Sequence, residues 1–349
     1  MAFPEFESDQ KKLLFFCRGR GRGHAIPDIE IVRGLAALRD DIDVRFVSYA
    51  SGARALEQAG CKLIDIALPE DGAAAEMTAV SGKLIGSLKP DLVVSHEEFA
   101  PLPVAKIFDR RTVFIIDWFI EADTYAMHCL KFADEILFLH GQGLHEEPSY
   151  LQGKVNYLGR MRRKFAYTKK DRAACRSELE LAANAFVIGV IPGGSSTETR
   201  APIADLLVAA FEALDTPHKH LVWLAGADFE NLSQQLSGRP DMTVLPSLQP
   251  PERLMAAADL VLVKANTGST FEALSLGVPV VAITQAADCV ADKILRSAEG
   301  VLLFDRRDSD SRGLLSAIQR QSKVTLEPIL EGQNVAARAA ARISELLTT

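Results

Sequence analysis

Residues 258–279 read ADLVLVKANTGSTFEALSLGVP, and this stretch decides the fold of the second half of the chain. Leu260–Val263 is a continuous apolar run, which is typical of a parallel strand covered on both faces. A loop of small residues follows, and then a helical segment that ends at Gly277. A buried strand, a short loop and a helix in this order predict a parallel sheet built from βαβ units.

The same alternation runs through the whole chain. In the first half we expect strands at Leu13–Cys17, Val44–Tyr49, Leu63–Ala67, Leu92–Ser95, Val113–Asp117 and Ile136–Leu139. Helical periodicity lies between them, for example at Ile29–Leu38, Pro101–Phe108 and Thr124–Phe132. In the second half we expect strands at Phe186–Ile191, His220–Ala225, Met242–Leu245, Leu260–Val263, Val278–Ile283 and Val301–Phe304.

The chain length and a break in the pattern predict two domains. At 349 residues the chain exceeds the size at which one core usually keeps growing. The pattern breaks at Gly159, before a basic stretch at 160–164, so we place the domains at 1–160 and 161–349. The amphipathic segment Ala336–Leu347 predicts a terminal helix that could pack back on the first domain. The expected fold is α/β, with two Rossmann-like doubly wound domains facing a cleft at the carboxyl ends of their strands.

Composition narrows the class of protein. A formal charge of −7 argues against nucleic acid as a partner. The five cysteines show no CxxC pair or metal-ligand spacing, as expected of reduced thiols in a cytoplasmic protein. No apolar run is long enough for a transmembrane segment, whereas peripheral membrane contact stays open because hydropathy does not detect amphipathic faces.

The loop after the first strand is the first candidate site. It contains Gly21, Arg22, Gly23 and His24 before a helix. Glycines permit close backbone approach, and a helix N-terminus favours an anion or an electron-rich oxygen. The GxGxGH spacing and the lack of an acidic residue ending Val47-Ser48-Tyr49 argue against dinucleotide binding, and no GK[ST] motif indicates a P-loop.

His24 is a candidate general base for an acceptor hydroxyl, because imidazole titrates near neutral pH. Asp117, at the end of its strand, could orient that imidazole and stabilise its charged form. Both residues also have ordinary structural interpretations. His24 could cap or brace the loop, and Asp117 could cap a helix or turn.

Two loops of the second half suit a phosphate or diphosphate. Gly193, Gly194 and Ser195 follow the strand Phe186–Ile191 as a candidate phosphate nest, with a plain glycine turn as the alternative. Gly268, Ser269 and Thr270 open the helix after Leu260–Val263, and Glu272 could accept both hydroxyls of a ribose. The spacing Ser269-x-x-Glu272 also fits a capping box that serves only the helix.

The assembled pattern resembles the GT-B glycosyltransferases. It is most similar to family 28, whose peptidoglycan enzyme moves N-acetylglucosamine from UDP to a lipid-linked acceptor. The loop with Gly21, Gly23 and His24 matches that family, and the run from Ala258 to Pro279 follows its carboxyl-domain signature without a gap. The resemblance implies that Glu272 binds the ribose, that Gly193, Gly194 and Ser195 form the first phosphate loop, and that Ser269 lies near the diphosphate. It also implies that the backbone of Val244–Leu248, including Leu248, contacts the base.

The chain departs from that family at two places. Asn266 replaces a glycine, which is tolerable because asparagine also enters the left-handed region. The family's paired glutamines are absent, and Gln285 and Asp288 lie about where they should be. The identity of the donor sugar is therefore open, although Asp288 could still meet sugar hydroxyls or act as an N-terminal helix acid.

The implied activity is inverting transfer of a sugar, of the hexosyltransferase type, from a nucleoside diphosphate sugar to an acceptor hydroxyl. We expect a UDP-sugar donor, an acceptor that the sequence does not name, and no separate cofactor. We expect no metal, because no DxD pair lies at a strand end. The alternatives are a sugar-nucleotide epimerase or hydrolase on the same fold, and a non-catalytic nucleotide-sugar-binding protein.

Overall fold

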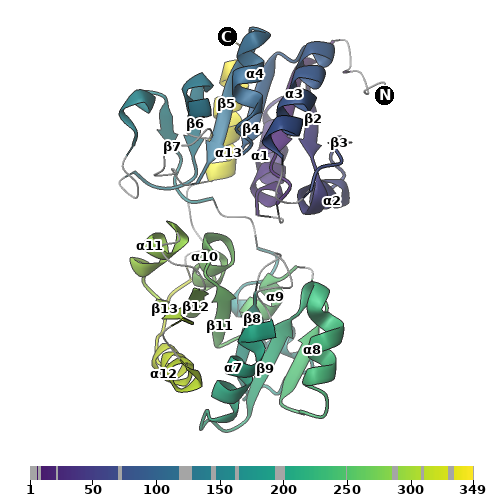
Figure 1. Ribbon diagram of the computed structural model, residues 1–349. Helices are drawn as coiled ribbons and strands as arrows, with labels where there is room; N and C mark the ends of the chain where they lie inside the picture. Colours follow the sequence, from purple (N-terminus) through teal and green to yellow (C-terminus); the bar gives the residue numbers. More distant parts are fainter. Residues whose placement is uncertain are drawn as a thin grey trace. The chain divides into compact units, whose positions relative to one another are not determined.

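The chain forms two α/β units in the computed structural model (Figure 1). The first unit comprises Met1–Arg163 with Gly332–Thr349, and the second comprises Lys164–Glu331. The structure describes residues 6, 9–20, 23–69, 73–117, 128–142, 147–161, 165–192, 201–248, 250–284, 290–307, 310–328 and 334–348.

The first unit is built on a seven-stranded parallel sheet with the order β3-β2-β1-β4-β5-β6-β7. Its strands are β1 (Lys11–Cys17), β2 (Ile42–Ser48), β3 (Leu63–Asp65), β4 (Leu92–His96), β5 (Arg111–Ile116), β6 (Glu135–Phe138) and β7 (Val155–Tyr157). Its helices are α1 (Ala25–Leu38), α2 (Ala50–Gln58), α3 (Ala74–Leu88), α4 (Pro101–Ile107) and α13 (Val335–Thr348), with short 3₁₀ turns η1 (Leu130–Phe132) and η2 (Ser149–Leu151).

Side-chain alternation along the central strands builds a core on each face of this sheet. Leu13 and Phe15 of β1 pack in the core that includes α1 and α13, whereas Leu14 and Phe16 pack in the core that includes α3 and α4. All four side chains have 0% exposure. This two-sided burial explains why the strands are apolar at consecutive positions in the sequence.

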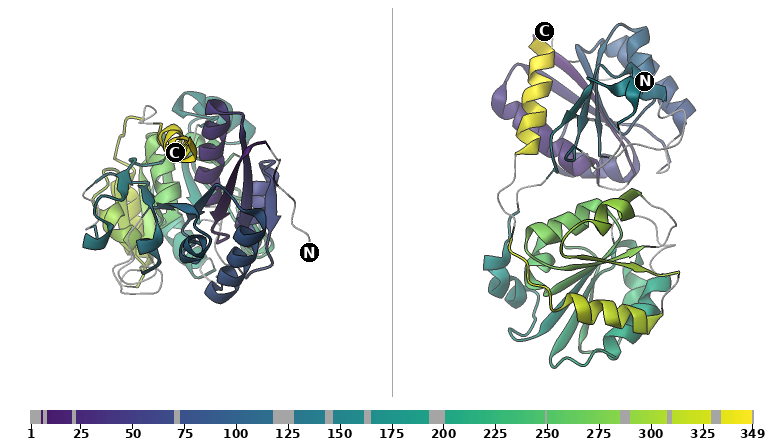
Figure 2. Two further views of the ribbon diagram at one scale, coloured as in Figure 1. Left: turned by 90° about the horizontal axis from the view of Figure 1, so that it is seen from above. Right: turned by 90° about the vertical axis from the view of Figure 1, so that its left-hand side faces the viewer.

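The C-terminal helix α13 belongs to the first unit, although it follows the second unit in the sequence. It packs along α1, and its buried residues Ala339, Ala340 and Ile343 join the α1 core. Figure 2 shows this helix in yellow against the purple and blue segments of the same unit. Arg342 of α13 also makes two contacts with the Glu135 carboxylate, at 2.6 and 2.7 Å. The division of the chain therefore differs from 1–160 and 161–349 in assigning this helix to the first unit.

The second unit has a six-stranded parallel sheet with the order β10-β9-β8-β11-β12-β13. Its strands are β8 (Phe186–Ile191), β9 (Lys219–Leu224), β10 (Met242–Leu245), β11 (Leu260–Lys264), β12 (Val280–Thr284) and β13 (Val301–Asp305). Its helices are α6 (Arg172–Glu178), α7 (Ala201–Glu212), α8 (Phe229–Gln235), α9 (Glu252–Ala257), α10 (Thr267–Ser275), α11 (Val290–Arg296) and α12 (Ser311–Gln321), with 3₁₀ turns η3 (Lys169–Asp171) and η5 (Gly226–Asp228).

The two doubly wound sheets confirm the predicted fold class, and every expected strand overlaps an observed one. The expected helix Thr124–Phe132 lies partly outside the described residues, and its described end is the 3₁₀ turn η1. The strand order reverses between β1 and β4 in the first unit and between β8 and β11 in the second. These switch points are where open α/β sheets hold ligands. In the described parts of the chain, no helix has the length and apolar composition needed to cross a membrane.

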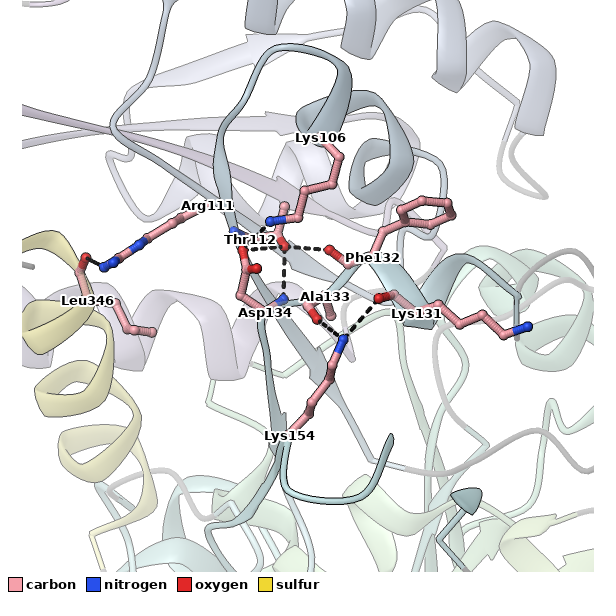
Figure 3. A network of polar contacts seen from close by, with 9 residues as sticks. All are labelled: Lys106, Arg111, Thr112, Lys131, Phe132, Ala133, Asp134, Lys154 and Leu346. Carbon is pink, nitrogen blue, oxygen red and sulfur yellow. Dashed lines mark hydrogen bonds and ion pairs between the residues drawn. The ribbon is translucent and has the colours of Figure 1, made fainter. Parts of the chain in front are cut away.

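At the amino ends of β5 and β6, a polar network ties the first sheet to its helices (Figure 3). Asp134 accepts hydrogen bonds from the backbone N–H of Thr112 and from the Lys106 ammonium group. These donors outweigh burial, which alone would raise the pKa of Asp134, and hold that pKa below its usual value. The network stabilises the end of the sheet opposite to the strand ends at the switch point.

The packing of α13 on α1 predicts a local loss of stability on truncation of its central side chain. Ile343→Ala removes a fully buried side chain and should destabilise the first unit by about 2–5 kcal/mol. Faster hydrogen exchange of the α1 amides, with α7 amides of the second unit unchanged, would report this loss. The control Glu345→Ala alters an exposed i,i+3 ion pair on the same helix and should change stability by less than about 1 kcal/mol. Unchanged α1 exchange in Ile343→Ala would contradict the prediction.

Candidate functional site

The candidate residues of the first unit gather at the β1/β4 switch point. Gly23, His24 and Asp117 are described, whereas Gly21 and Arg22 lie outside the described residues. His24 immediately precedes α1, and its side chain does not cap that helix by a hydrogen bond. A capping role for the imidazole is therefore wrong, and its function must lie in its other contacts.

His24 contacts a carboxylate that the sequence interpretation did not select. Its Nε2 lies 2.7 Å from Oε2 of Glu97, the residue that directly follows β4. The Arg18 guanidinium lies 3.6 Å from the same oxygen. The Glu97 side chain is 1% exposed and that of His24 is 17% exposed, so the carboxylate is buried while part of the histidine side chain reaches solvent.

Burial and charge act in opposite directions on this pair. Burial alone would lower the pKa of His24, but the Glu97 carboxylate and its hydrogen bond outweigh burial and raise that pKa. Burial alone would raise the pKa of Glu97, but the contacts with His24 dominate and lower it to about 2. Glu97 is consequently ionised at neutral pH, and the protonated form of His24 is favoured beside it.

The backbone at Glu97 adopts the left-handed region, with φ of 53°. For a non-glycine residue this conformation costs roughly 1–2 kcal/mol. Hydrogen bonds on both sides hold it, from Glu97 N–H to the Ile115 carbonyl at 3.2 Å and from Arg18 N–H to the His96 carbonyl at 3.3 Å. Strain of this kind is concentrated at functional sites, because it directs a side chain that a regular strand would place elsewhere.

Asp117 lies next to Glu97, and the hydrogen-bonded partner of the imidazole is Glu97. Burial and the Glu97 charge raise the pKa of Asp117 well above its usual value, which favours the protonated form of this carboxyl group. Oδ1 of Asp117 and Oε1 of Glu97 are both buried and meet no donor nitrogen or hydroxyl in the described part of the chain. The expected contact of Asp117 with His24 is thus replaced by a contact with Glu97.

A second histidine–carboxylate pair lies beside the first. Nδ1 of His96 is 2.6 Å from Oδ1 of Asp28, and both residues are buried. The rings of His24 and His96 meet edge to face, with centroids 4.9 Å apart. Next in the chain, Glu98 accepts a hydrogen bond of 2.6 Å from the Tyr49 hydroxyl.

Sequence analysis missed His96, Glu97, Glu98 and Asp28, although a signal was present for the first three. They interrupt the apolar pattern at the carboxyl end of the expected strand Leu92–Ser95, where parallel strands place functional groups. Asp28 gave no such signal, because an acidic residue in the first turn of a helix is commonplace.

In the second unit, α10 begins at Thr267 and is capped by Asn266. The Asn266 side chain accepts a hydrogen bond of 2.9 Å from the Ser269 N–H. The capping box Ser269-x-x-Glu272 is therefore wrong, because Ser269 lies inside the helix. The expectation that Asn266 enters the left-handed region is also wrong, since its φ of −150° and ψ of 153° are extended. Asparagine suits this position as an N-cap.

The remaining candidates of this unit differ in what they can contact. Thr270 is fully buried and its hydroxyl donates to the Asn266 carbonyl at 2.6 Å, so this side chain braces the turn and does not face a ligand. Gly268 is exposed at the start of α10, and Ser269 and Glu272 are half-buried. The Leu248 side chain packs against the core formed with α9 and α10. Gly193, Gly194, Ser195, Gln285 and Asp288 lie outside the described residues.

No family model matches the chain. Solved structures nevertheless match it over almost its full length. The kitacinnamycin glycotransferase is 19% identical, with a TM-score of 0.70 over 97% of this chain and 100% of that chain. A putative UDP-N-acetylglucosamine 2-epimerase from Listeria monocytogenes is 15% identical, with a TM-score of 0.68 over 97% and 98%. MurG from Acinetobacter baumannii is 14% identical, with a TM-score of 0.65 over 97% and 99%.

These similarities define the fold of the chain. Its two Rossmann-like sheets have the GT-B architecture, which the sequence resemblance implied. At identities of 14–19% the likeness carries the fold and leaves the activity to be argued from the site.

The His24–Glu97 contact predicts a change in the pKa of the imidazole. Glu97→Gln keeps the shape of the side chain and removes its charge, so burial should dominate and the pKa of His24 should fall below that of the wild type. NMR titration of the His24 ring protons would measure it, with His220→Ala as an assignment control in the second unit. An unchanged His24 pKa in Glu97→Gln would contradict the assigned pairing.

Proposed function

We propose that the protein transfers a sugar from a nucleoside diphosphate sugar to an acceptor hydroxyl with inversion at the anomeric carbon. The observation that carries this proposal is the His24–Glu97 contact of 2.7 Å at the β1/β4 switch point. An imidazole with a raised pKa, paired with a buried carboxylate and partly open to solvent, is suited to take a proton from a hydroxyl.

In this mechanism neutral His24 donates its Nε2–H to Glu97 and accepts the acceptor's proton at Nδ1, while the acceptor oxygen bonds to the anomeric carbon. The bond from that carbon to the diphosphate oxygen breaks, and the nucleoside diphosphate leaves with the electron pair. Glu97 stabilises the imidazolium that forms, as a carboxylate does in a catalytic triad. The raised pKa of Asp117 favours its protonated form, and this leaves Glu97 as the charged partner of His24.

The second unit is proposed to bind the donor at the start of α10. Thr267 and Gly268 lie in the first turn of α10, where backbone N–H groups have no partner within the helix. Such groups at a helix N-terminus are suited to a diphosphate. Glu272 lies one turn further along and is proposed to accept the ribose hydroxyls, and the donor base is proposed to be uracil.

A second candidate activity is hydrolysis or epimerisation of the nucleotide sugar. The carboxyl group of Asp117, whose raised pKa favours its protonated form, and the protonated form of His24 offer acids beside the ionised Glu97. Both reactions need an acid and a base. Incubation of the full-length protein with UDP-sugars, with and without hydroxyl acceptors, distinguishes these outcomes. A glycosylated acceptor of inverted configuration supports transfer, whereas free sugar or an epimer without any acceptor product replaces it with the second candidate.

The donor assignment predicts a loss of affinity on neutralising Glu272. Glu272→Gln should weaken UDP binding by about 1.5–3 kcal/mol, the value of a hydrogen bond to a charged group. Since Asn266 caps α10, the melting temperature should change little. Calorimetric titration would compare this variant with Glu299→Gln, which alters an exposed carboxylate of the same unit. Equal affinities for both variants would remove Glu272 from the donor site.

The general-base assignment predicts a loss of turnover on removing the imidazole. His24→Ala should lower the rate of UDP release from the donor by about 10²–10⁴-fold with donor affinity nearly intact. In the wild type, activity should rise with pH through a pKa above the ordinary histidine value of about 6.5, because Glu97 favours the charged imidazole. The variant should lack this limb. His220→Ala, whose ring contacts Thr243 in the second unit, is the matched control and should retain full turnover.

A further inference from the structure

We propose that Asp28 and His96 are positioning residues. This second pair keeps the Glu97 carboxylate in contact with the His24 imidazole and sets the pH range in which His24 acts as a base. The inference rests on the proposed function of His24. It concerns two residues that touch neither substrate nor reacting atoms in that mechanism.

The first argument is connectivity. Asp28 lies one turn after His24 on α1, and its N–H donates to the His24 carbonyl at 3.3 Å. Its carboxylate reaches Nδ1 of His96, the last residue of β4, at 2.6 Å. One buried hydrogen bond therefore ties the start of α1, which carries His24, to the strand end that carries Glu97. A charge-assisted hydrogen bond of this length is among the strong ones in proteins.

The second argument is strain. The left-handed backbone at Glu97 directs its carboxylate to His24, and such a conformation persists only where its surroundings hold it. His96, the preceding residue, is fixed by Asp28 through its ring and by Arg18 through its carbonyl. Releasing the ring would loosen one of the two peptide units that determine where the Glu97 carboxylate lies.

The third argument is packing and charge. The His96 ring lies edge to face with the His24 ring at 4.9 Å, so it limits rotation of the imidazole. Asp28 has 0% exposure, and its second carboxylate oxygen meets no donor in the described residues. A buried carboxylate so close to His24 acts on it through a medium of low dielectric constant, and it favours the charged imidazole.

The charged and titratable groups around His24 come from four elements. In the described residues they are Cys17 and Arg18 at the end of β1, Asp28 on α1, the run His96, Glu97 and Glu98 at the end of β4, and Asp117 after β5. Arg18 opposes the charged imidazole, whereas Glu97 and Asp28 favour it. Asp117 acts on His24 through Glu97. The Asp28 carboxylate makes its hydrogen bond with His96, and it acts on the His24 ring through its charge.

The test is Asp28→Asn in the full-length protein, which keeps the side-chain shape and removes the charge. The acid limb of the pH–rate profile should move to lower pH by about 1 unit, the size of one partly screened charge at short range. NMR titration of His24 without any substrate should show the same shift. Asp134→Asn is the matched control: it removes a carboxylate from the network at the opposite end of the same sheet (Figure 3). It should lower the melting temperature and leave the limb in place.

A second variant guards against misfolding. His96→Gln keeps a donor for Asp28 and removes the ring packed on His24, so kcat should fall while KM stays unchanged. An Asp28→Asn protein that folds with an unmoved His24 titration overturns the proposal, as does a His96→Gln protein with normal kcat. Failure of the proposed function can be told apart from failure of this inference. In that case the wild type would show no turnover, whereas the His24 titration without substrate would still shift in Asp28→Asn.

Discussion

Two-sided burial of both parallel sheets is the constraint on which the rest of the structure depends. Because helices cover each face, the central strands carry apolar side chains at consecutive positions, and polar groups are confined to the strand ends. At the carboxyl ends the connections lead into helices, so backbone N–H groups and polar side chains meet there. The site at the β1/β4 switch point follows from this arrangement, since β1 delivers Arg18 and His24 while β4 delivers His96 and Glu97.

Several carboxyl groups lie close together at the β1/β4 switch point, where little water reaches them. Their mutual repulsion and burial would destabilise the ionised forms. In the structure, two of them are paired with histidines, and the pKa of a third is raised well above its usual value. Glu97 is ionised against His24, Asp28 is bonded to His96, and burial beside Glu97 favours the protonated form of Asp117. Removing one partner of such a set leaves a buried group uncompensated, so its members act as a unit and not as independent contributors.

The sequence predicted what local pattern determines. Both sheets and their strand positions follow from apolar runs, glycine positions and chain length, because these features act within a few residues of one another. The same features locate the loop that carries His24 and the helix that carries Glu272. The partner of His24 could not be found in this way. Glu97 is 73 residues away, and its carboxylate reaches the imidazole only because β4 pairs with β1 and the backbone enters a left-handed conformation. The capping box failed for a different reason: Asn266 caps α10, whereas the sequence analysis treated this residue only as a replacement for glycine.

The division of the fold explains why activity must be argued from the site. Proteins described as glycosyltransferases and as an epimerase match both units of this chain almost end to end, at identities of 14–19%. The sheets therefore constrain where reacting groups can lie without deciding what they do. Transfer and its alternatives differ in which groups of the first unit must be protonated. A base must be available when a hydroxyl attacks. An acid must be available when a bond to oxygen breaks without an attacking alcohol. His24 lies beside both Glu97 and the Asp28–His96 pair; burial lowers its pKa, but the charges of Glu97 and Asp28 raise it and favour the protonated ring. In the proposed function, the availability of His24 as a base or as an acid is therefore connected to buried residues that the fold positions.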